Sequence, residues 1–156
     1  MDAVKVRWLE VADRWPGRNA VVASFIEPGS SVLDLGAGAG GLRTHLPDGC
    51  TYTGVDLPDF DMNRGRWPEG RWDVAVMAGV LEYARYPAAA FRHLHDLAPL
   101  AIVTYAHHPK RRDPTWNDIS REEIVAMAAK AGYTSAVETA SWSQRGIRPQ
   151  AVWLLR

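Results

Sequence analysis

Apolar and polar residues succeed one another in blocks along this chain, and the spacing of the apolar positions predicts strands that alternate with helices. Short, almost uninterrupted apolar runs are typical of strands buried in a parallel sheet. Helical spacing of apolar residues follows Pro87 and again follows Ser120, where Ser120 and Glu123 form a capping box. Strands separated by helices indicate a mostly parallel α/β sheet, to which a final hairpin adds an antiparallel strand. The predicted strands are 31–35, 51–56, 73–78, 100–105, 134–142 and 150–155.

The first residues predict an amphipathic helix over 1–17, because apolar residues recur at helical intervals with charged residues around the other side. Pro16 and Gly17 are expected to end it. A second, short helix is expected over 42–46. A chain of 156 residues is long enough for one hydrophobic core and too short for two lobes. Residues 1–156 are therefore expected to form a single domain.

A glycine-rich turn after the first predicted strand is the clearest candidate for a ligand site. In open parallel sheets, ligands bind outside the carboxyl ends of the strands. The spacing of Gly36, Gly38 and Gly41 satisfies G-x-G-x-x-G. Asp56, 20 residues after Gly36, ends the second strand, where an acid can hold a pair of ribose hydroxyls. The spacing by itself leaves two ligand classes open, dinucleotides and S-adenosylmethionine.

Asp34 discriminates between these two classes. It stands two residues before Gly36, at the strand end that faces the ligand. A carboxylate there would repel a pyrophosphate, which requires an uncompensated helix N-terminus. The same carboxylate favours a ligand that carries an ammonium and a sulfonium. The alternative, in which Asp34 only ties down the amides of the turn, stays open.

Two segments resemble the motifs of class I S-adenosylmethionine-dependent methyltransferases. Residues 34–40 (DLGAGAG) are similar to the D/E-x-G-x-G-x-G motif of that family. Residues 72–76 (WDVAV), followed by 79–83 (GVLEY), are similar to its fourth-strand motif, with Trp72 in place of the more usual Phe. The resemblance is good over residues 30–105 and rests on topology elsewhere.

The resemblance implies a Rossmann-like fold and a methyltransferase. The implied fold is an α/β domain with a seven-stranded, mostly parallel sheet in the order 3-2-1-4-5-7-6. The implied cofactor is S-adenosylmethionine, with S-adenosylhomocysteine as product. The neutral charge and the lack of an appended recognition domain favour a small-molecule or carbohydrate-like acceptor.

Site residues can be carried over from the family position by position. The glycine motif is implied to surround the methionine part of the cofactor, and the second-strand acid to bind the ribose. A further acid, 12 residues before Asp73, matches the one that binds the adenine amino group. The end of the fourth strand is implied to lie near the sulfonium. The cofactor-binding residues implied in this way are Asp34, Gly36, Gly38, Gly40, Asp56, Leu57, Asp61, Met62, Ala78 and Gly79.

The region between the second and third strands departs from the family. Asp56 and Asp61 are five positions apart, whereas a parallel crossover needs about a dozen residues or more. The helix between these strands must therefore be missing. Either the third strand is vestigial or the chain passes the adenine directly, and this puts Asp61 and Met62 in doubt. Without this helix, one flank of the sheet is left uncovered. We expect a partner subunit, such as a second copy, or the Trp-rich segments to cover it.

Catalysis of methyl transfer needs a general base only where the acceptor atom carries a proton. The candidates are Glu82, after the fourth strand, and His107, after the fifth. The alternative for Glu82 is a structural carboxylate at a helix entry. The alternative for His107 is that it has no catalytic role and belongs to an ordinary solvated connection over 106–119. The other interpretation of this stretch is a lid or an acceptor-binding loop.

The composition limits the kinds of partner that this protein is expected to bind. The 18 basic and 18 acidic residues balance, so the excess of positive charge typical of a nucleic-acid-binding protein is absent. No apolar run approaches the roughly 18 residues that span a bilayer. Cys50 is the single cysteine, no zinc-ligand spacing or acid cluster predicts a metal, and a reducing, cytoplasmic location is expected.

Two other functions stay open. A catalytically inactive S-adenosylmethionine-binding module, or a subunit of a larger assembly, is compatible with such a compact chain. A nucleotide-binding oxidoreductase is opposed by Asp34 and by the lack of a second domain for hydride chemistry.

Overall fold

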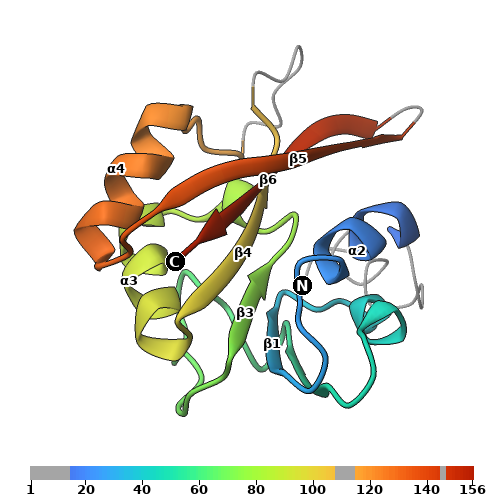
Figure 1. The fold of residues 1–156 in the computed structure, drawn as a ribbon. Helices are drawn as coiled ribbons and strands as arrows, with labels where there is room; N and C mark the ends of the chain where they lie inside the picture. The colour runs from blue at the N-terminus through green and yellow to red at the C-terminus, as the bar shows by residue number, and fades with distance from the viewer. Residues whose placement is uncertain (1–14, 108–114, 145–146) are drawn as a thin grey trace.

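The computed structural model describes residues 15–107, 115–144 and 147–156. Its centre is a six-stranded sheet with the order β2-β1-β3-β4-β6-β5 (Figure 1). The four strands β2, β1, β3 and β4 pair in parallel, and β6 runs antiparallel to both β4 and β5. The strands are β1 (Ser31–Leu35), β2 (Thr51–Val55), β3 (Val74–Met77), β4 (Leu100–Tyr105), β5 (Ala136–Gln144) and β6 (Ile147–Leu155).

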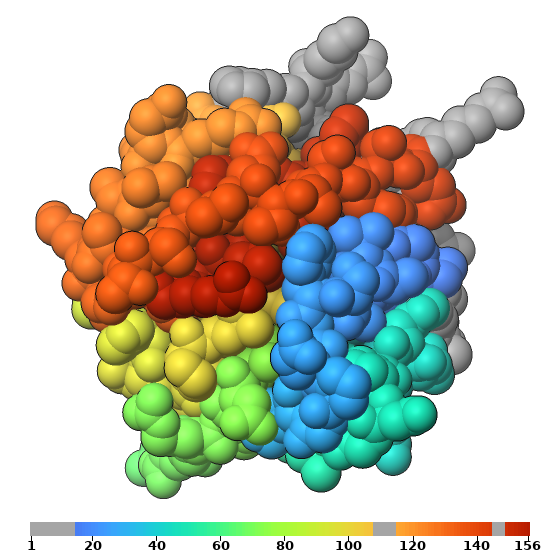
Figure 2. Space-filling model, viewed as in Figure 1, coloured from blue at the N-terminus to red at the C-terminus, as the bar shows by residue number. Residues whose placement is uncertain are grey.

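Helices cover both faces of this sheet. On one face lie α3 (Pro87–Leu97) and α4 (Arg121–Ala131), which contact each other. On the other face α2 (Pro16–Ala23) lies between β5 and the 3-10 helix η1 (Gly41–His45), as Figure 2 shows. A second 3-10 helix, η2 (Leu81–Tyr83), follows β3.

Alternation along the central strands divides the core between the two faces. Successive residues of a strand point to opposite sides of a sheet, and here both sides are buried. Val32 therefore packs with α2 and Leu33 with α3, and the same alternation holds for Ile102 and Val103 of β4. A continuous apolar run, rather than an apolar–polar alternation, is the sequence pattern that such doubly covered strands require.

The predicted α/β class and the relative order of the six strands are confirmed, but the seventh strand is not found. The segment 56–73, which is described throughout, forms turns instead of a strand. Its aromatic residues cover the core beside α3: Phe60 is buried against Trp67, and Trp67 stacks on His93 of α3 at a centroid distance of 4.5 Å. The third strand of the family is thus absent from this segment, and Trp67 covers this part of the core. The residues of β2 stay largely exposed, and cover of that edge by a partner subunit remains a prediction.

The predicted helices are present with altered bounds. The capping box is formed, with the Ser120 hydroxyl accepting from the Glu123 N–H and the Glu123 carboxylate accepting from the Ser120 N–H. The short helix over 42–46 is the 3-10 helix η1. Of the helix expected over 1–17, residues 1–14 lie outside the described residues. Pro16, which was expected to end that helix, is the first residue of α2, because proline fits the first helical turn, where its missing N–H costs nothing.

Candidate functional site

The glycine-rich turn connects β1 to η1 and is fixed by β2. The N–H groups of Gly36 and Ala37 both donate to the Val55 carbonyl, at 2.8 and 3.1 Å. Gly36, Gly38 and Gly40 all have positive φ. At Gly36 a side chain is excluded twice, because φ is +79° and a Cβ would collide with the Val80 side chain. The motif glycines therefore form a tight turn at the carboxyl end of β1.

Asp34 lies at the end of β1, between Gly54 of β2 and Val76 of β3 in the register. It is 5% exposed, and its Oδ2 accepts a 2.8 Å hydrogen bond from the Tyr52 hydroxyl. Burial raises the pKa of Asp34 to about 6, against the lowering effects of the Tyr52 hydrogen bond and the Arg18 charge. A buried carboxylate with this pKa is a favourable site for a cationic ligand group.

Asp56 follows β2 and contacts the glycine turn directly. Its Oδ2 accepts from the Gly38 N–H at 2.6 Å, and its Oδ1 accepts from the Leu57 N–H at 2.7 Å. The structure thus brings together the acid after the second strand and the motif glycines, 18 residues apart in sequence. Leu57, half-buried, follows in the same turn.

Asp61 and Met62 belong to the irregular segment that replaces the third strand. The Oδ1 of Asp61 accepts from the Asn63 N–H at 2.9 Å, so its carboxylate caps its own turn. Asn63 in turn bonds to the backbone of Tyr83 and Arg85, which ties the segment to the loop after β3. Met62 is half-buried and packs against the core on the α3 face.

Ala78 and Gly79 follow β3, where three other elements meet them. The Gly79 N–H donates to Oγ1 of Thr104 at 2.8 Å, and the Thr104 hydroxyl donates to Gln150 at 2.8 Å. A Cβ on Gly79 would lie 2.5 Å from Nη1 of Arg18, so the guanidinium occupies the space that a side chain would fill. Arg18 reaches this point from α2, across the carboxyl ends of the strands.

Glu82, in η2, is 3% exposed. Its Oε1 accepts from the Ala106 N–H at 3.0 Å at the end of β4. Its Oε2 is buried and has no hydrogen-bond partner among the described residues. Burial raises the pKa of Glu82, and the nearby positive charge of Arg18 lowers it. A buried carboxylate with one oxygen available has the properties of a proton acceptor.

His107 follows β4 on the α4 face, with both ring nitrogens in hydrogen bonds. The Trp153 indole N–H donates to Nε2 at 3.2 Å. Because an indole N–H can only donate, the ring proton must be on Nδ1, which contacts the Ile119 carbonyl at 3.2 Å. The ring packs against Tyr105, at a centroid distance of 4.9 Å, and against Trp153 at 5.9 Å. This arrangement fits a structural role; a catalytic role for His107 remains a prediction.

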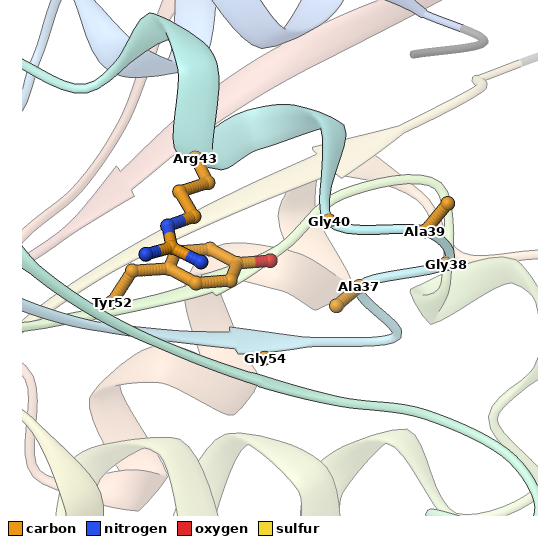
Figure 3. Close-up of a pocket in the computed structure, with 7 residues that line it drawn as sticks. All are labelled: Ala37, Gly38, Ala39, Gly40, Arg43, Tyr52 and Gly54. Atoms are coloured by element: carbon orange, nitrogen blue, oxygen red, sulfur yellow. The ribbon is translucent and has the colours of Figure 1, made fainter. Parts of the chain in front are cut away.

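A hollow of about 450 Å³ opens beside the glycine turn. It is lined by residues 37–40, Arg43, Tyr52 and Gly54. Figure 3 shows Arg43 and Tyr52 side by side on one wall, with the Tyr52 hydroxyl pointing toward the turn. Among residues 15–107, 115–144 and 147–156, no three His, Cys, Asp or Glu side chains are grouped so that they could hold a metal ion. In the same residues, none of the helices combines the length and apolar character of a membrane span.

Four residues of the site were not found from the sequence. Three of them contact predicted residues directly: Tyr52, Arg18 and Thr104. The fourth, Gln150, accepts from the Thr104 hydroxyl. All four lie outside both motifs. Their roles depend on contacts between elements far apart in sequence, for which the local pattern holds no signal. The one hint was Gly54, because a glycine inside a strand often marks a close approach.

These features define the class of the protein. The strand order reverses between β2 and β3 on either side of β1, and the glycine turn and the two carboxylates lie at that switch point. This is a Rossmann-like α/β domain of the kind that binds nucleotide-like cofactors at the carboxyl ends of its strands.

The chain belongs to the methyltransferase domain family, whose model matches residues 10–136. This confirms the resemblance to class I methyltransferases. Among curated proteins, no significant sequence match is found.

Several solved structures with a similar fold are those of methyltransferases. An S-adenosylmethionine-dependent methyltransferase from Aquifex aeolicus has a TM-score of 0.67 and 17% identity, over 99% of this chain and 98% of that chain. Magnesium protoporphyrin IX methyltransferase from Synechocystis PCC 6803, with bound S-adenosylhomocysteine, has a TM-score of 0.65 and 17% identity, over 100% and 88%. The 1,6-didemethyltoxoflavin-N1-methyltransferase of Burkholderia thailandensis has a TM-score of 0.62 and 15% identity, over 94% and 78%.

Proposed function

We propose that this protein transfers a methyl group from S-adenosylmethionine to a small-molecule or carbohydrate-like acceptor. The observation that carries the proposal is the buried carboxylate of Asp34 beside the positive-φ glycine turn. The charged residues present fit the cofactor: Asp34 and Asp56 supply negative charge for a ligand with cationic groups and hydroxyls, and Arg18 supplies positive charge for a carboxylate. The named acceptors of two structural neighbours, a porphyrin and a toxoflavin precursor, are also small molecules.

The bound cofactor supplies a methyl group already activated on a sulfonium, so that the protein's main task is to hold the two reactants in line. In this proposal Asp34 faces the cationic end of the methionine part, and Gly36, Gly38 and Gly40 let the backbone approach it. Asp56 accepts from the ribose hydroxyls. The adenine side is assigned to Leu57, Asp61 and Met62, and the surroundings of the sulfonium to Ala78 and Gly79.

Glu82 is the group we assign to proton removal from the acceptor. It is buried next to the end of β4, and its Oε2 lacks a partner among the described residues. A hydroxyl of the acceptor would satisfy that oxygen and place its proton there. The raised pKa of Glu82 moves this carboxylate toward the range in which a base works best near neutral pH.

The test of cofactor class is titration calorimetry of the purified protein with S-adenosylmethionine, S-adenosylhomocysteine and NAD in parallel. We expect binding of the first two and none of NAD, and loss of binding in Asp34→Ala. Binding of NAD alone would refute the proposal.

Turnover is tested with a methyl-labelled cofactor and a panel of sugars and small hydroxylated heterocycles. Glu82→Gln is expected to lower kcat at least about a hundred-fold, the range of a lost general base, with the affinity for S-adenosylhomocysteine unchanged. His107→Gln is expected to lower stability, because it disturbs the partner of a buried indole N–H, and to retain kcat. A His107 variant that folds normally and loses turnover would move the base to His107.

An inactive cofactor-binding module is the alternative, favoured by the short connections. The link from β1 to β2 contains only the five-residue helix η1, and segment 56–73 forms turns where the family has a helix. Cofactor binding without methyl transfer to any acceptor, with or without a partner protein, would favour the module.

A further inference from the structure

The Tyr52 hydroxyl reaches Asp34 from an unexpected position. In the pairing of β1 with β2, Tyr52 stands opposite Val32, and Gly54 stands opposite Asp34. The hydroxyl nevertheless donates to Oδ2 of Asp34 at 2.8 Å. The Tyr52 side chain must therefore lie along its own strand, over Gly54, before it reaches the neighbouring one.

Gly54 is the residue that makes this path possible. A Cβ at Gly54 would lie 2.8 Å from the Tyr52 hydroxyl oxygen, 3.0 Å from its Cε1 and 3.0 Å from Cβ of Ala37. Gly54 is not among the glycines with positive φ, so the backbone conformation does not require a glycine here. Glycine also weakens a strand. The space needed by Tyr52, together with the close approach of Ala37, therefore accounts for Gly54.

We propose that Tyr52 is a positioning residue of the cofactor site: its hydroxyl orients the Asp34 carboxylate and keeps it ionised, and Gly54 provides the space. The proposal rests on the proposed function, in which Asp34 faces the cationic end of S-adenosylmethionine. A buried carboxylate without such a donor would favour its neutral form, which does not attract a cation.

The groups that affect the charge of Asp34 lie on β2, on α2 and in the turn after β2. Burial raises the pKa of Asp34 to about 6; the Tyr52 hydrogen bond and Arg18 of α2 lower it, and Asp56 after β2 raises it. Removing the Tyr52 hydroxyl takes away the larger of the two lowering effects. The pKa of Asp34 then rises, and the protein loses affinity for a cationic ligand at low pH first.

The test is Tyr52→Phe, with dissociation constants for S-adenosylmethionine at pH 6 and pH 8.5, each divided by the wild-type value at the same pH. If the pKa of Asp34 rises by about one, its ionised fraction at pH 6 falls from about one half to about one tenth. We expect binding about five-fold weaker at pH 6 and within about two-fold of wild type at pH 8.5. Division by wild type cancels the titration of the ligand itself.

Gly54→Ala is the second variant, because it keeps the Tyr52 hydroxyl but fills the space over Gly54 in which the Tyr52 side chain lies. It should show the same pH-dependent loss, and the double variant Tyr52→Phe/Gly54→Ala should be no weaker than the worse single variant. Tyr133→Phe is the matched control, because the Tyr133 hydroxyl is also buried and, among the described residues, has no hydrogen-bond partner. Its ratio should stay near one at both pH values.

A direct readout is the Asp34 carboxyl titration by NMR without cofactor, where Tyr52→Phe should shift the midpoint upward. An unchanged midpoint, or an affinity ratio that does not depend on pH, would overturn the role of Tyr52 while wild-type binding still supports the proposed function. Absence of S-adenosylmethionine binding by the wild-type protein at either pH would overturn both.

Discussion

Asp34→Asn should stabilise the folded protein relative to wild type, and this gain should be larger at neutral pH than at acid pH. The same substitution should remove cofactor binding. The Asp34 pKa is raised from the model-peptide value of 3.8 to about 6 by burial. One pKa unit corresponds to about 1.4 kcal/mol, so ionising this carboxyl in the folded protein costs about 3 kcal/mol more than in the unfolded chain. Asparagine has nearly the same shape and no charge.

The direction of the pH dependence follows from proton binding. Well below pH 4, Asp34 is protonated in both states and carries no penalty. Between about pH 4 and 6 the folded state keeps the proton and the unfolded chain releases it, so the stability contributed by this group falls as pH rises. Above pH 6 the full penalty is present. The unfolding free energy of Asp34→Asn minus that of wild type should therefore grow by about 2–3 kcal/mol between pH 4 and pH 8.

The assay is urea unfolding of both proteins at pH 4, 6 and 8, followed by circular dichroism. Asp73→Asn is the control with a pKa shift of the opposite sign, because hydrogen bonds from the Ser31 N–H and hydroxyl lower the pKa of that exposed carboxyl. The stabilising contribution of such a carboxyl is lost only as pH falls below about 4, so the difference between Asp73→Asn and wild type should stay nearly constant from pH 4 to pH 8. A difference for Asp34→Asn that is constant with pH, or that declines as pH rises, would refute the reasoning.

Two further substitutions test other parts of the structure. Gly36→Ala should lower stability by about 1–3 kcal/mol, because it forces a positive φ and a contact with Val80; thermal unfolding checks this, and Val80→Ala in the same chain should restore part of the loss. Ser120→Ala should lower stability by about 1 kcal/mol through loss of the α4 cap, with the affinity for S-adenosylhomocysteine unchanged in calorimetry. A full loss of affinity in Ser120→Ala would mean that α4 contributes to the site.

The sequence was sufficient wherever one element carries its own signal. The strands β1, β3 and β4 are buried on both faces and therefore appear as apolar runs, and β4 has the predicted bounds of residues 100–105. The signals for the two ends of α4 also lie close together in the sequence. Ser120 caps its beginning, and Gly132, with a positive φ, ends it. The site residues at strand ends, such as Asp34, follow from the same logic, because topology alone places the carboxyl ends of parallel strands together.

The sequence was insufficient wherever a structural role depends on a distant partner. Nothing local distinguishes Tyr52 from an ordinary strand residue, since its contact with Asp34 exists only once β1 and β2 have paired. Pro16 is compatible with either the end of one helix or the start of the next, and the pattern cannot separate the two. The short spacing between Asp56 and Asp61 predicted that the helix after β2 is missing. It did not predict the stacking of Trp67 on His93 of α3, because these residues are 26 positions apart.

The stability of this protein and its proposed chemistry act in opposite directions at the same two residues. Asp34 and Glu82 are both nearly fully buried, and burial raises the pKa of each. An apolar or amide side chain at either position would avoid this cost. The Tyr52 hydroxyl and the Arg18 charge reduce the cost at Asp34 without removing it. A fold of this size has few kcal/mol to lose, so two buried acids whose burial is only partly compensated, at the ends of β1 and β3, are expected where bound reactants complete their interactions.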